Sequence, residues 1–190
     1  MLGAGGGWAK SILFNPAAQA AFADFFARDN TFTLGVCNGC QMLTQLNSII
    51  PGATAWPRFL RNRSEQFEAR LVMTEVLESP SVLLAGMAGV RAPLVVAHGE
   101  GRAEFADVPP QACLRYLDNH GRPAQYYPHN PNGSPHGITG VTSADGRATI
   151  LMPHPERVFL KHQFSWLDPT WRGAESPWFG LFANARRFVA

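Results

Sequence analysis

A cysteine flanked by two glycines, between a predicted strand and a predicted helix, restricts the fold of this chain more than any other feature. Residues 31–36 are short, apolar and β-branched, which is typical of a buried strand. Residues 38–48 carry large apolar side chains at helical spacing and predict a helix. Cys37 then lies in the sharp turn where a strand enters a helix. Such strand–turn–helix units are typical of α/β proteins.

The rest of the chain continues this alternation of helices and strands. Asn15 followed by Pro16 is a helix start signal, and Asp145-Gly146 between two apolar segments predicts a β-hairpin. The glycines of Gly3–Gly7 predict a shaped loop. We expect further helices over 17–28 and 177–189, and further strands over 67–76, 94–97, 112–117, 138–142 and 148–152. The pattern predicts one α/β domain over residues 1–190.

The composition excludes several classes of protein. Hydrophobic residues make up 46% of the 190 residues and charged residues 16%, which is typical of a globular domain and not of a disordered chain. The net charge of +2 comes from scattered arginines, so we expect no nucleic-acid partner. No apolar run approaches the ~20 residues that span a bilayer, so we expect no membrane partner. Three cysteines are poor material for a disulfide framework, and we expect a reduced, cytoplasmic setting.

Cys37 has the surroundings of a nucleophile. The turn would strain its backbone, and we expect glycine at positions 35 and 39 because side chains there would collide with the turn. The positive end of the helix dipole would lower the pKa of the thiol, and the backbone N–H of Asn38 could face an oxyanion.

Two other interpretations of the cysteine remain open at this point. Cys37 could be a small buried apolar residue at the end of a strand. Alternatively, Cys37 and Cys40 could form a metal or redox pair. A zinc site would need a second cysteine pair, and the chain offers only the isolated Cys113 in addition.

His154 is distinguished from the other five histidines by its sequence context. It directly follows the predicted strand 148–152, and Pro153 and Pro155 restrict the backbone on both sides. Sites in open α/β sheets assemble at the ends of strands. Glu156 could accept a hydrogen bond from the imidazole and orient it, which would give a nucleophile, a base and an orienting carboxylate. Taken alone, a His-Pro-Glu segment is more typical of a loop.

Together these motifs resemble a known family. Gly35–Gln41 with His154-Pro155-Glu156 looks like the triad of class I glutamine amidotransferases, and the finer match is to the C-terminal glutaminase domain of large, single-chain phosphoribosylformylglycinamidine (FGAM) synthases. The resemblance covers nearly the whole chain from Gly3 to the final helix. It also rests on Gly7–Asn15, Trp56–Phe59, Phe67–Arg70, His98–Arg102, Asn130–Pro135 and Met152–Phe159.

The resemblance implies a three-layer, flavodoxin-like α/β fold and a ligase component that hydrolyses L-glutamine. Cys37 would attack the side-chain amide, His154 would pass the proton to departing ammonia, and Glu156 would hold His154. The resulting thioester would be hydrolysed to glutamate. A synthetase domain of the same enzyme would use the ammonia, with ATP and magnesium, to aminate formylglycinamide ribonucleotide in purine biosynthesis; this domain itself would hold no cofactor and no metal.

The resemblance also suggests residues that bind the substrate. Gln41 resembles the position that holds glutamine, and His98 and Glu100 would line the site or face the synthetase domain. The segment Asn130–Pro135 would be an ordered loop with a binding role, whereas an ordinary turn-rich loop is the alternative. Gly6 stands where the family pattern has an acidic residue. Glycine has no side chain to make the local contact that an acidic residue would make there.

In the family, the domain begins upstream of the position that matches Met1. It begins with strands and a Gly-Gly-Phe-Ser loop that supplies a second oxyanion amide. We therefore expect that this chain is truncated, with the first strands missing. We also expect it to be a poor glutaminase alone.

Two alternatives to an active glutaminase remain. One is an impaired amidotransferase fragment that acts only as an interaction domain, and the other is an unrelated cysteine hydrolase of similar fold.

Overall fold

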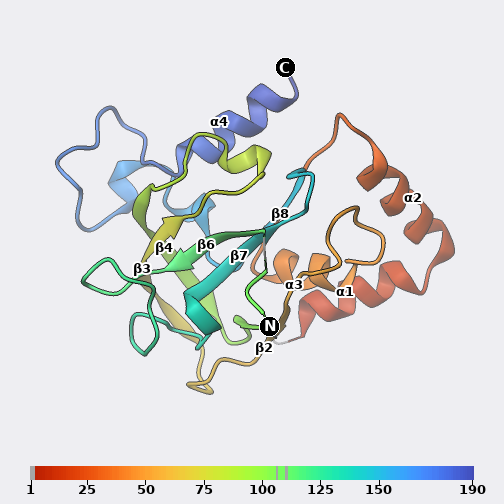
Figure 1. The fold of residues 1–190 in the computed structure, drawn as a ribbon, viewed down its shortest axis with the longest axis horizontal. Helices are drawn as coiled ribbons and strands as arrows, with labels where there is room; N and C mark the ends of the chain where they lie inside the picture. The colour runs from red at the N-terminus through yellow and green to blue at the C-terminus, as the bar shows by residue number, and fades with distance from the viewer. Residues whose placement is uncertain (1–2, 106, 110) are drawn as a thin grey trace.

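A six-stranded mixed sheet with the order β1-β8-β7-β6-β3-β4 forms the centre of the protein (Figure 1). The computed structural model describes residues 3–105, 107–109 and 111–190. β1 runs parallel to β8, and the other neighbours in the sheet are antiparallel. The strands of this sheet are β1 (Thr33–Val36), β3 (Glu68–Val76), β4 (Arg91–His98), β6 (Ala112–Tyr116), β7 (Ile138–Thr142) and β8 (Ala148–Leu151). β2 (Arg58–Leu60) and β5 (Arg102–Glu104) form a separate antiparallel pair.

Helices cover the sheet and close two apolar clusters against it. The helices are α1 (Ala4–Leu13), α2 (Pro16–Ala27), α3 (Asn38–Gln45) and α4 (Phe179–Phe188), with short 3₁₀ turns at η1 (Val82–Leu84), η2 (Pro135–Gly137), η3 (Pro155–Arg157) and η4 (Lys161–Gln163). Ile150 of β8 belongs to the cluster that contains α1 and α3, whereas Leu151 belongs to the cluster that contains α4. Neighbouring residues of a strand point to opposite faces, so the two clusters lie on opposite sides of the sheet. The α/β fold class with flanking helices is confirmed.

The glycine-rich start of the chain is a helix, and the prediction of a loop over Gly3–Gly7 is wrong. Helix α1 includes Gly5, Gly6 and Gly7. A Cβ atom on Gly5 would lie 2.6 Å from the carbonyl oxygen of Asn38 and 2.6 Å from Cβ of Gln41. The small residues therefore let α1 approach α3 closely, and this tertiary contact outweighs the poor helix propensity of glycine.

Several predicted elements occur with changed limits. The helix predicted over 38–48 ends at Gln45, and the strand predicted over 94–97 extends over 91–98. The strands β2 and β5 have only three residues each and were not predicted. Helix α2 begins as expected, because the Asn15 side chain accepts hydrogen bonds from the N–H groups of Ala17 and Ala18 at 3.1 and 3.2 Å.

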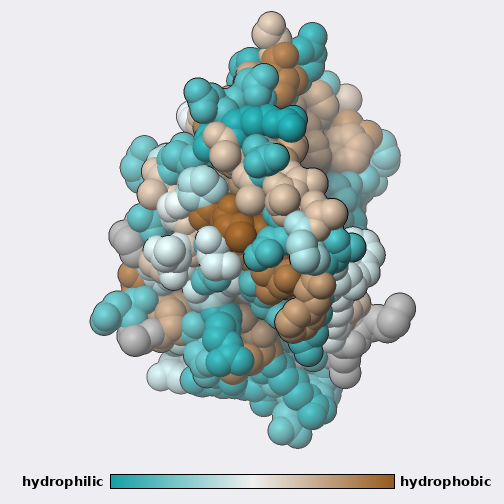
Figure 2. All heavy atoms as spheres, turned by 90° about the vertical axis from the view of Figure 1, so that its right-hand side faces the viewer, coloured by the Kyte–Doolittle hydropathy of each residue, from teal (hydrophilic) through white to brown (hydrophobic). Residues whose placement is uncertain are grey.

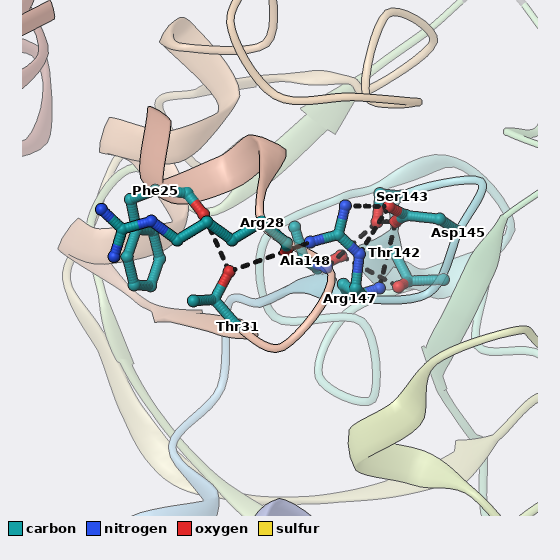
Figure 3. Close-up of polar contacts among 8 residues, drawn as sticks. All are labelled: Phe25, Arg28, Thr31, Thr142, Ser143, Asp145, Arg147 and Ala148. Atoms are coloured by element: carbon teal, nitrogen blue, oxygen red, sulfur yellow. Dashed lines mark hydrogen bonds and ion pairs between the residues drawn. The ribbon is translucent and has the colours of Figure 1, made fainter. Parts of the chain in front are cut away.

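The predicted hairpin between β7 and β8 also anchors the segment that leads into β1 (Figure 3). Asp145 accepts a hydrogen bond from Ser143 at 2.5 Å and forms an ion pair with Arg147 at 2.8 Å. Arg147 in turn donates to the carbonyl oxygen of Arg28, just after α2, and Thr31 donates to the same oxygen at 3.1 Å. These contacts hold the end of α2 against the hairpin, which places β1 beside β8.

Helices α1 and α2 lie on the right-hand side of Figure 1, and Figure 2 shows this side as a space-filling surface. Hydrophobic residues gather near the middle of this face, with hydrophilic residues around them. Trp8 and Phe14 are among the exposed large apolar residues of this helical layer, with exposed fractions of 68% and 82%. Within the ranges that the structure describes, no helix is long and apolar enough to cross a membrane.

Candidate active site

Cys37 lies in a strained turn between β1 and α3. Its φ of 52° and ψ of −106° are unusual for a residue with a side chain, and its N–H donates to the carbonyl oxygen of Leu151 at 3.0 Å. A Cβ atom on Gly35 would lie 2.6 Å from Cδ1 of Leu43 and 2.9 Å from the carbonyl oxygen of Gly39. The expected need for glycine at position 35 is therefore confirmed. The same expectation for Gly39 is wrong, because a Cβ atom there would meet nothing within 4 Å.

The parallel pairing of β1 with β8 brings Cys37 and His154 to the same edge of the sheet. Val36 pairs with Leu151, so the residues that follow the two strands leave the sheet together. The N–H of His154 donates to the carbonyl oxygen of Val95 at 2.8 Å, which ties the histidine to β4 as well. The imidazole is buried, with 7% of the residue exposed.

Glu156 lies beside the ring of His154, as the sequence predicts. Nδ1 of His154 and Oε1 of Glu156 are 2.6 Å apart. Burial alone would lower the pKa of His154, but the nearby Cys37 and the hydrogen bond with Glu156 raise it to about 9. Burial works against ionisation of Glu156, yet the contact with His154 keeps the pKa of the carboxyl group below its ordinary value. The surroundings of His154 consequently favour its protonated ring, which lies between the Glu156 carboxylate on one side and Cys37 on the other.

A pocket of about 390 Å³ lies at this edge of the sheet and brings the predicted site residues together. Glu156 is the exception among them, since it lies behind His154 and does not line the pocket. The lining comes from four separate segments of the chain: Val36, Cys37, Asn38 and Gln41; Phe67; Ala97, His98, Gly99 and Glu100; and His154 and Arg157. Asn38 is the first residue of α3, so its N–H lies outside the hydrogen-bond ladder of the helix and is available to the pocket.

The pocket contains buried polar atoms that have no partner among the described residues. They are Oε1 of Gln41, both ring nitrogens of His98 and Nε2 of His154. His98 is 3% exposed, and burial lowers the pKa of its ring to about 4. A neutral imidazole has one donor and one acceptor. Because unpartnered buried polar atoms are costly, this group of atoms indicates a polar ligand.

Cys40 does not have the environment of a nucleophile. It is 0% exposed in the core beside Cys37, and burial raises the pKa of its thiol well above the ordinary range. All three cysteines are free thiols in the structure. In the part of the chain that the structure describes, no group of three or more His, Cys, Asp or Glu side chains could hold a metal ion.

The residues that support the pocket from behind are not evident from the sequence. Asn62 and Asn132 are buried, with exposed fractions of 2% and 0%. Both donate hydrogen bonds to the backbone of residues 98–101. The sequence singles out Asn132 only as part of a stiff loop that is expected to bind a ligand. Hydrogen bonds of Asn130 and Asn132 hold this loop in the structure, and its order and binding role stay predictions.

Family comparison identifies the type of domain. The model of the CobB/CobQ-like glutamine amidotransferase domain matches residues 1–189 of the chain. The chain belongs to this family. A chain of the Thermotoga maritima PurLQS structure is similar to this amidotransferase domain with a TM-score of 0.64 and 23% identity, over 94% of this chain and 68% of that one. A putative GMP synthase subunit from Thermoplasma acidophilum is similar with a TM-score of 0.50 and 10% identity, over 94% of this chain and 67% of that one. At these identities, the two structures support the fold of the amidotransferase domain.

Proposed function

We propose that this amidotransferase domain hydrolyses L-glutamine through a thioester on Cys37 and supplies the ammonia to an FGAM synthase. The observation that carries the proposal is that Cys37 and His154 line one pocket, with Glu156 behind the histidine and its Oε1 2.6 Å from His154 Nδ1. The membership in a glutamine amidotransferase family supports glutamine as the substrate.

The proposed first half-reaction makes the thioester. The Cys37 sulfur, as a thiolate, attacks the side-chain carbonyl carbon of glutamine, and the carbonyl oxygen becomes an oxyanion. The N–H of Asn38 faces this oxygen. His154 donates its proton to the amide nitrogen, the carbon–nitrogen bond breaks, and ammonia leaves. Glu156 keeps the imidazole oriented and stabilises its charge.

The second half-reaction returns the enzyme to its starting state. Water attacks the thioester carbon and gives one proton to His154, and the carbon–sulfur bond breaks with the thiolate and imidazolium restored. The new carboxyl group gives up the other proton to solvent as glutamate leaves. Gln41 and His98 would hydrogen-bond the polar groups of glutamine, because Oε1 of Gln41 and both ring nitrogens of His98 have no other partner among the described residues. Glu100 would bind the α-amino group or contact the synthetase.

The finer assignment to FGAM formation is supported by the sequence blocks that resemble FGAM synthases and by the fold similarity to PurLQS. In this proposal a synthetase component, not this domain, binds ATP and magnesium and converts formylglycinamide ribonucleotide to formylglycinamidine ribonucleotide.

Ammonia release from glutamine by the complete protein tests the proposed function. We expect Cys37→Ala to abolish the release and His154→Ala to lower kcat by about 10²–10⁴-fold, since general acid–base catalysis contributes that much. Glu156→Ala should cost less, because an imidazole without its orienting carboxylate still reaches the productive position part of the time. A control with asparagine in place of glutamine tests the length of the side chain that the pocket accepts.

The outcome separates the proposal from its main alternative. Normal docking to a synthetase, without any glutamine-dependent ammonia release by the wild type, would instead indicate an interaction domain. Glutamine hydrolysis without amination of formylglycinamide ribonucleotide would keep the glutaminase and overturn the FGAM assignment.

A further inference from the structure

The turn at residues 98–101, between β4 and β5, forms one wall of the pocket and is held almost entirely through its backbone. The N–H of Asn62 donates to the carbonyl oxygen of Gly99 at 2.9 Å, and Nε2 of Gln41 donates to the backbone carbonyl oxygen of Glu100 at 2.7 Å. Two of the four residues of the turn are glycines, which have many backbone conformations open to them. The turn therefore depends on outside groups for a fixed shape.

Asn62 clamps both ends of this turn with one buried side chain. Its Nδ2 donates to the carbonyl oxygen of His98 at 2.8 Å, and its Oδ1 accepts from the N–H of Gly101 at 2.9 Å. The Nδ2 atom also donates to the carbonyl oxygen of Gln66 at 3.0 Å. Asn62 thus joins the turn to the segment that leads into β3.

Asn132 holds the turn from the opposite side of Gly101. Its Nδ2 donates to the Gly101 carbonyl oxygen at 2.7 Å, and its Oδ1 accepts from the hydroxyl group of Ser134 at 2.7 Å. The Ser134 hydroxyl in turn accepts from the N–H of Ala103 at 2.9 Å. The backbone of Gly101 is consequently fixed at its N–H by Asn62 and at its carbonyl by Asn132.

The ring of His98 packs against the fixed backbone of Gly101. A Cβ atom on Gly101 would lie 2.4 Å from Cε1 and 2.5 Å from Nδ1 of His98, so the ring packs directly against the glycine. No hydrogen bond holds the ring nitrogens within the described residues, so packing, including this close contact with Gly101, locates the ring.

We propose that Asn62 and Asn132 are positioning residues for glutamine binding, which act by fixing Gly101 and, through it, the imidazole of His98. The inference rests on the proposed function, in which His98 contacts glutamine. It predicts a defect in substrate binding that leaves the chemistry of Cys37 intact, because Cys37 and His154 are held by Leu151, Val95 and Glu156 and not by either asparagine.

The test compares Asn62→Ala and Asn132→Ala with Asn184→Ala in the complete protein. Asn184 is a matched control, since only 7% of it is exposed, but its side chain bonds to Leu83, Ala85 and Arg187, far from the turn. We expect the KM for glutamine to rise roughly 10-fold in the first two variants, which is the scale of one or two lost hydrogen bonds, with a smaller change in kcat. The Asn184 variant should lose stability with an unchanged KM. Alkylation of Cys37 by iodoacetamide should proceed at the wild-type rate in all three.

A second comparison asks whether the asparagines act through His98. In a His98→Ala background, Asn62→Ala should add little to the KM, because the ring that it positions is already absent. A full additional 10-fold effect there, or an equal rise of KM in the Asn184 variant, would overturn the inference. Hydrogen exchange of residues 98–101 provides a readout that needs no activity, and we expect faster exchange in both variants. Unchanged exchange would also contradict the inference, whereas a wild type that releases no ammonia would contradict only the proposed function.

Discussion

His98 and His154 line one pocket, but their surroundings favour different charge states of the imidazole ring. Burial keeps His98 neutral, whereas the contacts with Cys37 and Glu156 favour the protonated form of His154 in spite of its burial. A positive His154 carries the proton that departing ammonia needs. A neutral His98 can offer both a donor and an acceptor to a bound amino acid.

We predict that the two imidazoles titrate at opposite ends of the accessible pH range. His154 should stay protonated until the pH rises through about 9, and His98 should stay neutral until the pH falls through about 4. Titration of the ring resonances by NMR measures both. Glu156→Gln should lower the pKa of His154, since it replaces a carboxylate with a neutral amide. A His154 ring that titrates near its ordinary pKa of 6.5 would show that the contacts with Cys37 and Glu156 do not persist in solution.

At this scale the sequence predicts the residues that do chemistry and misses the residues that position them. Cys37, His154 and Glu156 stand in short motifs whose local backbone carries the signal, namely glycines beside a strand end and prolines around a histidine. Asn62 bonds to residues 36 and 39 positions away, and Asn132 to one 31 positions away. Nothing in the local pattern of an asparagine indicates such partners.

The turn from β1 into α3 is the element on which the site depends most. Gly35 lies under this turn, where a side chain would overlap with the backbone of Gly39 and with Leu43. Gly39 lies in the first turn of α3 with open space around it. The two glycines have the same spacing from Cys37 but different physical roles, which only the packing of α3 against β1 distinguishes.

We predict that Gly35→Ala and Gly39→Ala differ sharply in their effect. Gly35→Ala should lower the free energy of unfolding by about 1–3 kcal/mol, the usual cost of overpacking, and should displace Cys37. Gly39→Ala should be neutral or stabilising by up to about 1 kcal/mol, because alanine favours the helix. Urea denaturation measures both, and the rate of glutamine hydrolysis reports on Cys37. Equal losses of stability in the two variants would contradict the proposed geometry of the turn.

Elements with a strong local signal were predictable, and elements made by long-range packing were not. The cap at Asn15 and the turn at Asp145-Gly146 define α2 and the β7–β8 hairpin through contacts within a few residues. Helix α1 was missed because its glycines are poor helix formers, and its reason for being helical lies in α3. The short strands β2 and β5 depend on each other across the chain.

Across the whole molecule, the strand order decides which segments meet at the pocket. β8 is the partner of β1, although α3 and the strands β2 to β7 lie between them in the sequence. Phe67, just before β3, and residues 97–100, at the end of β4 and just after it, line the pocket from other segments. The α/β class follows from the alternation of elements, but the mixed sheet, with its parallel pair of β1 and β8, depends on pairings that residue patterns do not specify.

The most direct measurement is the reaction of the complete protein with a diazo-ketone analogue of glutamine, followed by mass spectrometry of the labelled peptide. Cys37 and Cys40 lie in one tryptic peptide between Arg28 and Arg58, so fragment spectra must locate the label. The proposed site predicts covalent modification of Cys37 alone, at a rate that glutamine suppresses and that falls when His154 is replaced by alanine. Modification of Cys40 instead, or labelling of Cys37 that glutamine does not slow, would contradict the assignment of this pocket as a glutaminase site.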